Sequence, residues 1–263
     1  MSFFKSIILS FSTFSAIPMP RIEWNSKNMR YMMCTFPLVG ALIALFCAAF
    51  VIFAQYLTGI HKNLSPTLLA LIFTLIPVFI SGGIHLDGFM DTCDALASHA
   101  SREKKLEILK DSHSGAFAIL GCVLYFLSYF VLSLEVFRRP LHLINLLPLF
   151  SIFMISRILS AFAVSTFPIA KDSGLVHTFA SATIKNFTAL WCSFWLILIS
   201  MLLIYFFNFL GIALVATSLS IFCLYFLVAV RNFGGITGDT AGWFVQICEI
   251  SALAVFVVMV CVK

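Results

Sequence analysis

Seven apolar runs, each about as long as a lipid bilayer is thick, constrain the fold of this chain most strongly. They cover residues 35–57, 65–84, 115–136, 143–165, 187–209, 212–230 and 243–262. A membrane-spanning helix needs roughly 17–25 mostly apolar residues. The composition agrees, because 62% of the residues are hydrophobic and 10% are charged, whereas soluble domains have about 25% charged residues. The sequence therefore predicts an all-α polytopic integral membrane protein with about seven transmembrane helices, in which residues 1–263 form a single domain in the lipid bilayer.

The connections between these runs differ in charge. The fifth and sixth runs are separated only by residues 208–211, which predicts a tight helical hairpin. Polar residues gather in four places, before Met32 and over 85–114, 168–185 and 231–242. With seven spans these segments share one side of the membrane, and they hold eleven of the 16 lysines and arginines, against four on the other side. The positive-inside rule then predicts that the polar catalytic face lies in the cytoplasm, at the inner membrane of a bacterial cell.

The net charge and the cysteines exclude other classes of protein. The loop asymmetry explains a net charge of +5, so no nucleic-acid partner is expected. The eight cysteines form no C-x-x-C pair, and most lie within apolar runs. They are interpreted as small apolar side chains, so neither a disulfide nor a zinc site is expected.

Three aspartates, Asp87, Asp91 and Asp94, lie close together in a chain that has few charges. Their i, i+4, i+7 spacing places them on one face of a helix, where like charges repel one another. A divalent cation would offset that repulsion, and Mg²⁺ prefers oxygen ligands. His85, two residues earlier, is a candidate general base. The spacing alone leaves open a second interpretation, a solvated helix end without a metal.

A second motif, Asp-Ser-His-Ser-Gly at residues 111–115, stands immediately before the third apolar run. An Asp or Ser at this place is commonly a helix N-cap, but helix starts also bind phosphate through their backbone N–H groups. The candidate substrate-binding residues here are Asp111, Ser112, His113 and Gly115.

A third motif, Gly-Gly-Ile-Thr-Gly-Asp, precedes the last apolar run. Glycine permits backbone conformations that turn successive N–H groups toward an anion. The candidate phosphate-binding residues are Gly234, Gly235, Thr237 and Gly238, and Asp239 is a candidate metal ligand. A flexible turn between two membrane helices would explain the glycines but not the carboxylate.

Two charged residues fall inside predicted spans, Arg157 in the fourth and Glu249 in the last. Such charges usually face a cavity or a partner. Arg157 is therefore a candidate phosphate ligand, with a structural pairing to an acid as the alternative. Together with the three motifs it indicates a metal–pyrophosphate site at one membrane face, because phosphoryl transfer is catalysed mostly by positioning and charge neutralisation. The residues thus predict a membrane-embedded phosphotransferase.

These motifs, in their order along the chain, resemble those of a known family. GGIHLDGFMDTCDAL, DSHSG and GGITGDTAG, with SFSTFSAIPMP near the N-terminus, closely resemble the cobalamin synthase family, also called adenosylcobinamide-GDP ribazoletransferases. The resemblance extends from about Ser10 to Glu249. It implies an integral membrane enzyme of late cobalamin (vitamin B12) biosynthesis. Such an enzyme joins adenosylcobinamide-GDP to alpha-ribazole or alpha-ribazole phosphate and releases GMP, with Mg²⁺ as its cofactor.

On this resemblance we expect the catalytic residues to be Asp87, Asp91, Asp94 and His85. The three aspartates would hold Mg²⁺ on the substrate pyrophosphate, and Asp111 or Asp239 would complete the metal shell. A carboxylate or His85 would take the proton of the attacking ribose hydroxyl. Homo-oligomers, or an association with other enzymes of the pathway, are compatible with the sequence.

Two other functions are weighed against this one. A small-molecule transporter would also have broken helices and intramembrane charges, but here the acids gather at one face and no inverted repeat is visible. A CDP-alcohol phosphatidyltransferase also uses Mg²⁺ and aspartates at a membrane face. Its usual pattern has an arginine after D-G-x-x-A and two later aspartates four residues apart, which the D-G-F-M-D of residues 87–91 does not reproduce.

Overall fold

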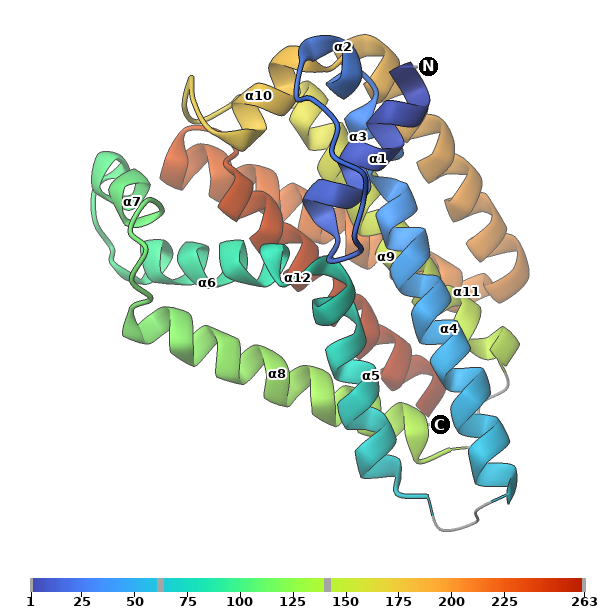
Figure 1. Ribbon diagram of the computed structural model, residues 1–263. Helices are drawn as coiled ribbons and strands as arrows, with labels where there is room; N and C mark the ends of the chain where they lie inside the picture. The colour runs from blue at the N-terminus through green and yellow to red at the C-terminus, as the bar shows by residue number, and fades with distance from the viewer. Residues whose placement is uncertain (1, 61–63, 140–142, 262–263) are drawn as a thin grey trace.

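The computed structural model describes residues 2–60, 64–139 and 143–261, which are almost entirely helical (Figure 1). The helices are α1 (Ser2–Phe14), α2 (Ser26–Met29), α3 (Met32–Thr35), α4 (Pro37–Ile60), α5 (Pro66–Ser81), α6 (Ile84–Ala97), α7 (Arg102–Ile108), α8 (Ala116–Phe137), α9 (Leu143–Thr166), α10 (Leu175–Ala182), α11 (Lys185–Phe233) and α12 (Gly238–Phe256), with a π-helical turn at Val257–Cys261. Among the described residues five helices are long and apolar enough to cross a membrane, or six if the bent pair α5–α6 forms one span. The predicted all-α polytopic membrane fold is confirmed.

α11 consists of two arms rather than one straight rod. Its 49 residues would extend about 74 Å at about 1.5 Å per residue, more than twice the roughly 30 Å of a bilayer core. Asn208 leaves the helical region, with φ 46° and ψ −120°. A Cβ atom on Gly211 would collide with the carbonyl group of Leu203, a contact that the pitch of a straight helix forbids. The chain therefore reverses here (Figure 1), as the hairpin predicted at residues 208–211 requires.

The second predicted span is shorter than its apolar run. α5 ends at Ser81, and α6 leaves it at an angle of 94°. Gly82 and Gly83 make this bend with φ values of 67° and 77°, which residues with a side chain rarely adopt. The span predicted over 65–84 thus corresponds to α5, and α6, which carries the three aspartates, takes its own direction.

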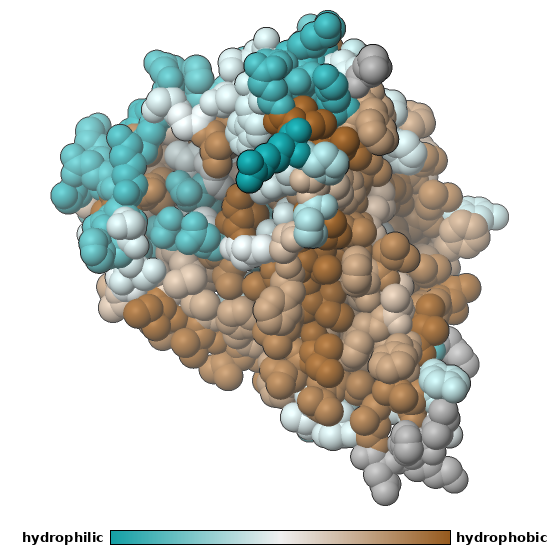
Figure 2. Space-filling view, viewed as in Figure 1, coloured by the Kyte–Doolittle hydropathy of each residue, from teal (hydrophilic) through white to brown (hydrophobic). Residues whose placement is uncertain are grey.

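α9 is the central helix of the bundle. Most of its side chains are buried, and α4, α11 and α12 pack around it. By contrast, α8 and α11 expose many leucine, isoleucine and phenylalanine side chains. Figure 2 shows the resulting apolar surface over the lower and right parts of the molecule, with hydrophilic residues gathered at the upper left. Because lipid tails are as apolar as leucine, such a surface is expected where helices face lipid.

The polar connections meet at one end of the bundle. α2, α7 and α10 all lie there, as do the first turns of α8 and α12 (Figure 1). This is the grouping that seven alternating spans predict. The last apolar run, 243–262, falls in α12 and the π-helical turn, and its residue 262 lies outside the described residues, as does Lys62 of the opposite side.

Candidate active site

α6 and α12 cross in direct backbone contact. A Cβ atom at Gly88 of α6 would lie 2.7 Å from Cα of Asp239, and one at Gly242 of α12 would lie 2.7 Å from the carbonyl oxygen of His85. Neither position has room for a side chain, so the helices approach as closely as small residues allow. The order of the contacts is opposite along the two helices, so they run antiparallel. Asp239, at the start of α12, therefore lies beside the middle of α6.

Three of the predicted metal ligands share this crossing. Asp87 is exposed, and Asp91 and Asp239 are half-buried. The charges of Asp87, Asp239 and Asp94 all act on Asp91, and the charge of Asp87 acts on Asp239. Like charges at such range disfavour one another unless a cation lies between them. The spacing predicted that the acids of α6 share one helix face. The structure places Asp239 of a second helix, α12, beside that face.

Asp94 has a different surrounding. Its Oδ2 accepts a hydrogen bond from the backbone N–H of Gly115 (2.5 Å), and its Oδ1 accepts one from the backbone N–H of Ala118 (3.0 Å). These N–H groups belong to the start of α8, where a helix has no internal acceptor for them. A Cβ atom at Gly115 would collide with the carboxylate. Asp94 thus caps α8 from the neighbouring helix α6.

The motif at residues 111–115 folds back on itself. Asp111 accepts a hydrogen bond from the backbone N–H of His113 (3.0 Å), and its carboxylate also contacts Nδ1 of that residue (2.8 Å). The N–H donor of His113, helped by the imidazole, holds the pKa of the Asp111 carboxyl below its ordinary value. Asp111, Ser112 and His113 are exposed to solvent. Of the two residues predicted to complete the metal shell, Asp239 therefore stands at the α6–α12 crossing, and Asp111 is occupied within its own loop.

The glycine motif forms the turn between α11 and α12 and is held by the segment that follows α9. The N–H of Ile236 donates to the carbonyl oxygen of Pro168 (2.8 Å), and the N–H of Ala170 donates to that of Ile236 (3.0 Å). Gly235 lies so close to Pro168 that a Cβ atom there would be 2.5 Å from the carbonyl oxygen. This close approach requires glycine and fixes the turn in place.

The start of α12 combines a cap with an open face. The Thr237 hydroxyl accepts a hydrogen bond from the N–H of Thr240 (3.1 Å), and the Thr240 hydroxyl accepts one from the N–H of Thr237 (2.9 Å). Thr237, which the sequence predicts as a phosphate ligand, thus serves as the N-cap of the helix that carries Asp239. A Cβ atom at Gly238 would have no neighbour within 4 Å, so the first turn of the helix is accessible to a ligand.

Sequence reasoning missed the basic side chains around this turn. The Arg102 guanidinium lies over Gly234, where it would collide with a Cβ atom. Lys171, in the connection after α9, donates from Nζ to a backbone carbonyl oxygen of α7 (2.9 Å), and its charge interacts with those of Lys110 and Asp239. Partial burial, and then the charge of Lys110, lower the pKa of Lys171. No spacing pattern links these residues, because they come from two connections that are distant in sequence.

A cavity of about 280 Å³ opens between Lys171 and the start of α12. Lys110, Lys171 and His177 line it, together with residues 236–239 of the glycine motif. We name it the basic cavity. Cationic side chains beside the start of a helix suit phosphate groups.

A second cavity, of about 160 Å³, shares Gly238 and Asp239 with the basic cavity. It is lined mostly by apolar and aromatic side chains, with Asp87 and His85 among them, and we name it the aromatic cavity. His85 is 6% exposed and stacks on Phe14 with ring centroids 6.1 Å apart. Its Nε2 has no hydrogen-bond partner. The candidate base therefore shares a cavity with Asp87 and has an unsatisfied polar atom.

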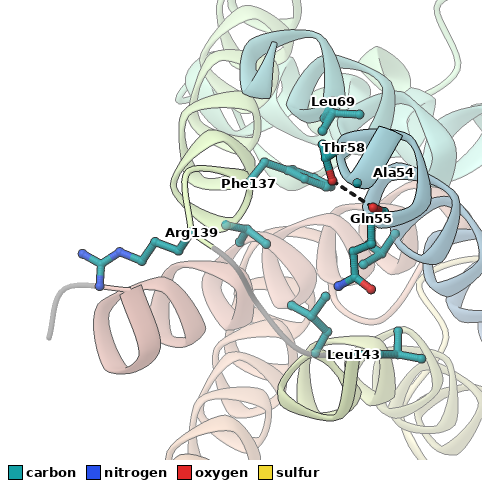
Figure 3. Close-up of a pocket in the computed structure, with 11 residues that line it drawn as sticks. Ala54, Gln55, Thr58, Leu69, Phe137, Arg139 and Leu143 are labelled. Carbon is teal, nitrogen blue, oxygen red and sulfur yellow. Dashed lines mark hydrogen bonds between the residues drawn. The ribbon is translucent and has the colours of Figure 1, made fainter. Parts of the chain in front are cut away.

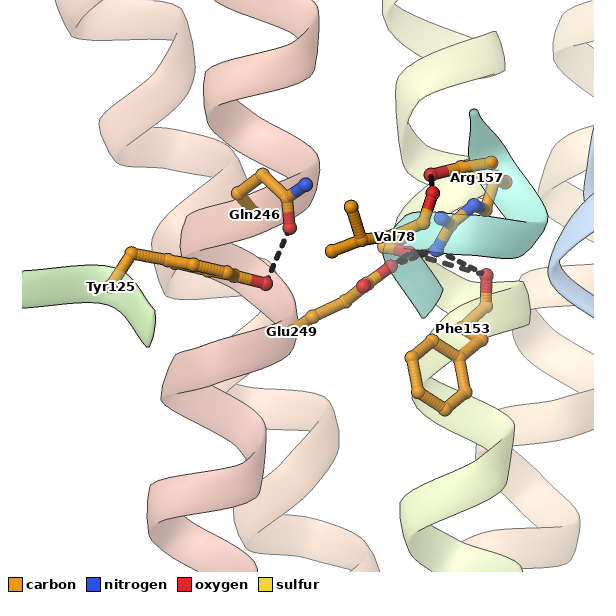
Figure 4. Close-up of polar contacts among 8 residues, drawn as sticks. Val78, Tyr125, Phe153, Arg157, Gln246 and Glu249 are labelled. Atoms are coloured by element: carbon orange, nitrogen blue, oxygen red, sulfur yellow. Dashed lines mark hydrogen bonds and ion pairs between the residues drawn. The ribbon is translucent and has the colours of Figure 1, made fainter. Parts of the chain in front are cut away.

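Arg157 is buried in the bundle and forms an ion pair with Glu249 (Figure 4). The two residues are 1% and 3% exposed. Arg157 also donates to the Ser156 hydroxyl (3.0 Å) and to the carbonyl oxygen of Phe153 (3.2 Å). The structure therefore shows the pairing with an acid, which the sequence left as the alternative to phosphate binding, and Arg157 lines neither of the two cavities.

A cavity of about 470 Å³ lies at the opposite end of the bundle. Figure 3 shows its lining, in which the Thr58 hydroxyl donates to the carbonyl oxygen of Gln55 (3.0 Å). Arg139 is the single charged residue among the described residues that line it. Its lining has no carboxylate among the described residues, in contrast to the cluster of carboxylates at the α6–α12 crossing.

The carboxylates at the crossing fit the usual binding mode of Mg²⁺. In the part of the chain that the structure describes, no three His, Cys, Asp or Glu side chains stand together as a complete metal site. Mg²⁺ usually binds through one or two carboxylates, several waters and the phosphates of a substrate. Asp87, Asp91 and Asp239 can supply such carboxylates, and the adjoining basic cavity can hold the phosphates.

Comparisons with known proteins match almost the whole chain to one family. The model of the cobalamin-5-phosphate synthase family matches residues 6–257. The adenosylcobinamide-GDP ribazoletransferase of Lachnoclostridium phytofermentans is 40% identical over 255 residues, which cover 96% of this chain and 93% of the relative. The enzyme of that name from Clostridium botulinum (strain Alaska E43) is 34% identical and covers 95% of this chain and 96% of its own. The one from Geobacillus sp. (strain WCH70) is 31% identical, with 92% and 91% covered. No solved structure matches the chain.

Proposed function

Because the chain belongs to the cobalamin-5-phosphate synthase family, we propose that the carboxylates at the α6–α12 crossing and the basic cavity beside them form its active site. The protein is an adenosylcobinamide-GDP ribazoletransferase of late cobalamin biosynthesis, an enzyme embedded in the membrane. It transfers the cobinamide-phosphate moiety of adenosylcobinamide-GDP to alpha-ribazole or its phosphate, and GMP leaves. The family membership decides against the transporter and the CDP-alcohol phosphatidyltransferase.

The observation that carries this assignment is the meeting of opposite charges at Asp239. On one side lie the carboxylates of Asp87 and Asp91, and on the other lie Lys110 and Lys171. A pyrophosphate needs both kinds of partner, since metal ions bridge its oxygens and basic side chains neutralise the rest of its charge. A site with carboxylates alone would repel the nucleotide.

Each group then has a chemical task. Asp87, Asp91 and Asp239 would hold Mg²⁺, which supplies charge neutralisation at the pyrophosphate and at the departing GMP. Lys171 and Lys110 bind phosphate oxygens from the basic cavity. The open first turn of α12 at Gly238 presents its backbone N–H groups to the same anion.

The acceptor reaches the phosphorus from the aromatic cavity, which Asp87 and His85 both line. A ribose hydroxyl oxygen of the acceptor forms the new bond to the phosphorus on the cobinamide side, and the bond from that phosphorus to the GMP oxygen breaks. The hydroxyl proton passes to Asp87 or to His85. Asp94 holds α8 to α6 and so keeps the aspartate helix in place.

The active site faces the cytoplasm in this proposal. α7 and the connection after it carry Arg102, Lys104, Lys105 and Lys110, and Lys110 lines the same basic cavity as Asp239. Figure 2 shows hydrophilic residues gathered on the side of the molecule where Figure 1 places α7. Basic connections of this kind are retained on the cytoplasmic side.

The test is GMP release by the purified protein in lipid vesicles that receive adenosylcobinamide-GDP and alpha-ribazole phosphate. We expect release with Mg²⁺ and none with EDTA. D87N and D239N should lower kcat roughly 100-fold, the size typical of losing one group that stabilises charge in the transition state, and should raise the Mg²⁺ concentration needed for half-maximal rate. The control is E107Q, which removes an exposed carboxylate of α7 that pairs with Lys104 (3.0 Å). Wild-type Mg²⁺ dependence in both aspartate variants would contradict the assignment.

A further inference from the structure

The aromatic cavity differs from the rest of the site in its chemistry. It has a volume of about 160 Å³ and lies between α1, α3, α6, α9, α10 and α12. Its lining includes Phe14, Phe36, Val164 and Phe179, together with Asp87 and Asp239. The two acids of the active site thus stand at one part of a cavity that is otherwise almost entirely apolar.

Three phenylalanine rings shape this cavity. Phe14 contacts Phe36 with ring centroids 4.4 Å apart, and it contacts Phe179 edge-on at 5.6 Å. Aromatic walls of this kind favour planar aromatic ligands, through stacked and edge-to-face contacts. The size is also suitable, since an apolar cavity of about 150 Å³ is known to hold one benzene ring.

One polar atom inside the cavity wall has no partner. Nε2 of His85 makes no hydrogen bond, although the residue is 6% exposed. A buried polar atom normally has a partner, and an exception calls for an explanation. A ligand that carries one or two polar atoms on a planar ring system would provide that partner.

We propose that the aromatic cavity binds the planar base of the ribazole acceptor, with the ribose at the mouth formed by Asp87 and Asp239. The inference rests on the proposed function, because it takes those two acids as the place of reaction. The base lies among the rings of Phe14, Phe36 and Phe179, and His85 donates to or accepts from the nucleoside. The acceptor and the nucleotide thus occupy separate cavities that meet at Asp239.

The guanine of the departing GMP is the competing occupant, and its chemistry argues against it. Guanine presents acceptors at N7 and O6 and a donor at N2. The aromatic cavity offers few polar side chains to meet them, and a polar edge buried without partners weakens binding strongly. A base with a largely apolar edge suits these walls better.

The experiment measures equilibrium binding of alpha-ribazole, and separately of its phosphate, to the purified protein in lipid nanodiscs with EDTA present. V164F fills the cavity from α9, and F179L removes one of its rings. Each should weaken ribazole binding roughly tenfold, the effect expected from losing contacts of this kind, and should leave the Kd of GMP unchanged. The control is F150L, because Phe150 is 5% exposed in the same core, lies on the same helix as Val164 and lines none of the described cavities.

The outcomes separate this inference from the proposed function. Unchanged ribazole binding in both V164F and F179L would overturn the inference. The inference would also fail if the two variants weakened GMP binding instead of ribazole binding. Because one variant adds volume and the other removes it, a folding failure of one leaves the other to decide. If D239N keeps its turnover while V164F loses ribazole binding, the carboxylate assignment fails and the aromatic cavity stands. If D239N loses turnover but V164F and F179L bind ribazole normally, the carboxylate assignment stands and the inference about the aromatic cavity fails.

Discussion

Gly88 of α6 and Asp239 of α12 touch backbone to backbone, so that a Cβ atom on Gly88 would lie 2.7 Å from Cα of Asp239. Asp87 directly precedes this glycine in the sequence, and Asp91 follows it by three residues. The contact therefore sets how far the acids of α6 stand from the acid of α12. Any side chain at position 88 must push the two helices apart.

We predict that G88A lowers kcat roughly 100-fold, because a displacement of about 1 Å in a catalytic group can cost that much. G59A is the matched control, since a Cβ atom there meets nothing within 4 Å and alanine favours the helix. GMP release and thermal unfolding would be measured together. Wild-type turnover in G88A would show that the crossing tolerates a wider separation and does not position the acids.

Lys171 gives a prediction for pH. Its pKa is lowered, first by partial burial and then by the charge of Lys110, so it loses its proton at a lower pH than an ordinary lysine. A neutral amine binds phosphate weakly. We therefore expect the KM for adenosylcobinamide-GDP to rise with pH, beginning below 10.5, the ordinary value for lysine.

The matched variants are K171R and K110Q. In K171R the part of the rise that begins below pH 10.5 should disappear, because a guanidinium stays charged over this range. In K110Q it should move to higher pH, because the repelling charge is gone. Steady-state kinetics over a pH series measure both effects. The same pH profile in all three proteins would exclude Lys171 as a phosphate ligand.

The seven apolar runs predicted most of the fold correctly, because spanning a bilayer imposes a length and a polarity that a single sequence displays. The hairpin at Asn208 was predictable for the same reason, since 49 residues cannot cross a bilayer once. The bend at Gly82 and Gly83 was not predicted. Its residues continue the apolar run, and the 94° angle comes from backbone conformation, which hydropathy does not register.

The candidate site could also be predicted only in part. The grouping of Asp87 with Asp91 followed from helical spacing, and Asp239 was a candidate because a plain turn does not need the acid in its glycine motif. The capping role of Asp94 did not follow, because its partner N–H groups lie 21 and 24 residues later in the sequence. Lys171 was missed because only tertiary folding brings it to the start of α12.

Arg157 and Glu249 give a prediction for stability. Both are almost fully buried and paired with each other, so removing one leaves an uncompensated charge in the bundle. E249Q or R157M should destabilise the protein by about 3–5 kcal/mol, and the double variant should lose clearly less than the sum of the two losses. Thermal unfolding in detergent, run as a double-mutant cycle, measures this coupling.

The same cycle decides between the two roles weighed for Arg157. If Arg157 is only a structural partner of Glu249, R157M changes the nucleotide KM only because it destabilises the protein. The double variant should then recover both the stability and the KM. As a phosphate ligand it would raise KM in R157M and in the double variant alike. A matched control is S156A, which removes a hydroxyl that bonds both residues without removing a charge.

Asp94 allows the helix-capping role to be separated from metal binding. Both of its oxygens accept N–H groups at the start of α8, and the side-chain amide of an asparagine can replace only one of those acceptors. We predict that D94N loses about 1.5–3 kcal/mol of stability, the usual worth of hydrogen bonds to a charged group.

The Mg²⁺ concentration for half-maximal GMP release in D94N should stay as in the wild type, whereas D87N should raise it. D172N serves as the control, because Asp172 is an exposed acid in the connection before α10. A raised Mg²⁺ requirement in D94N without loss of stability would make Asp94 a metal ligand after all, because a cap that does not touch the metal cannot change its affinity while the helices stay in place.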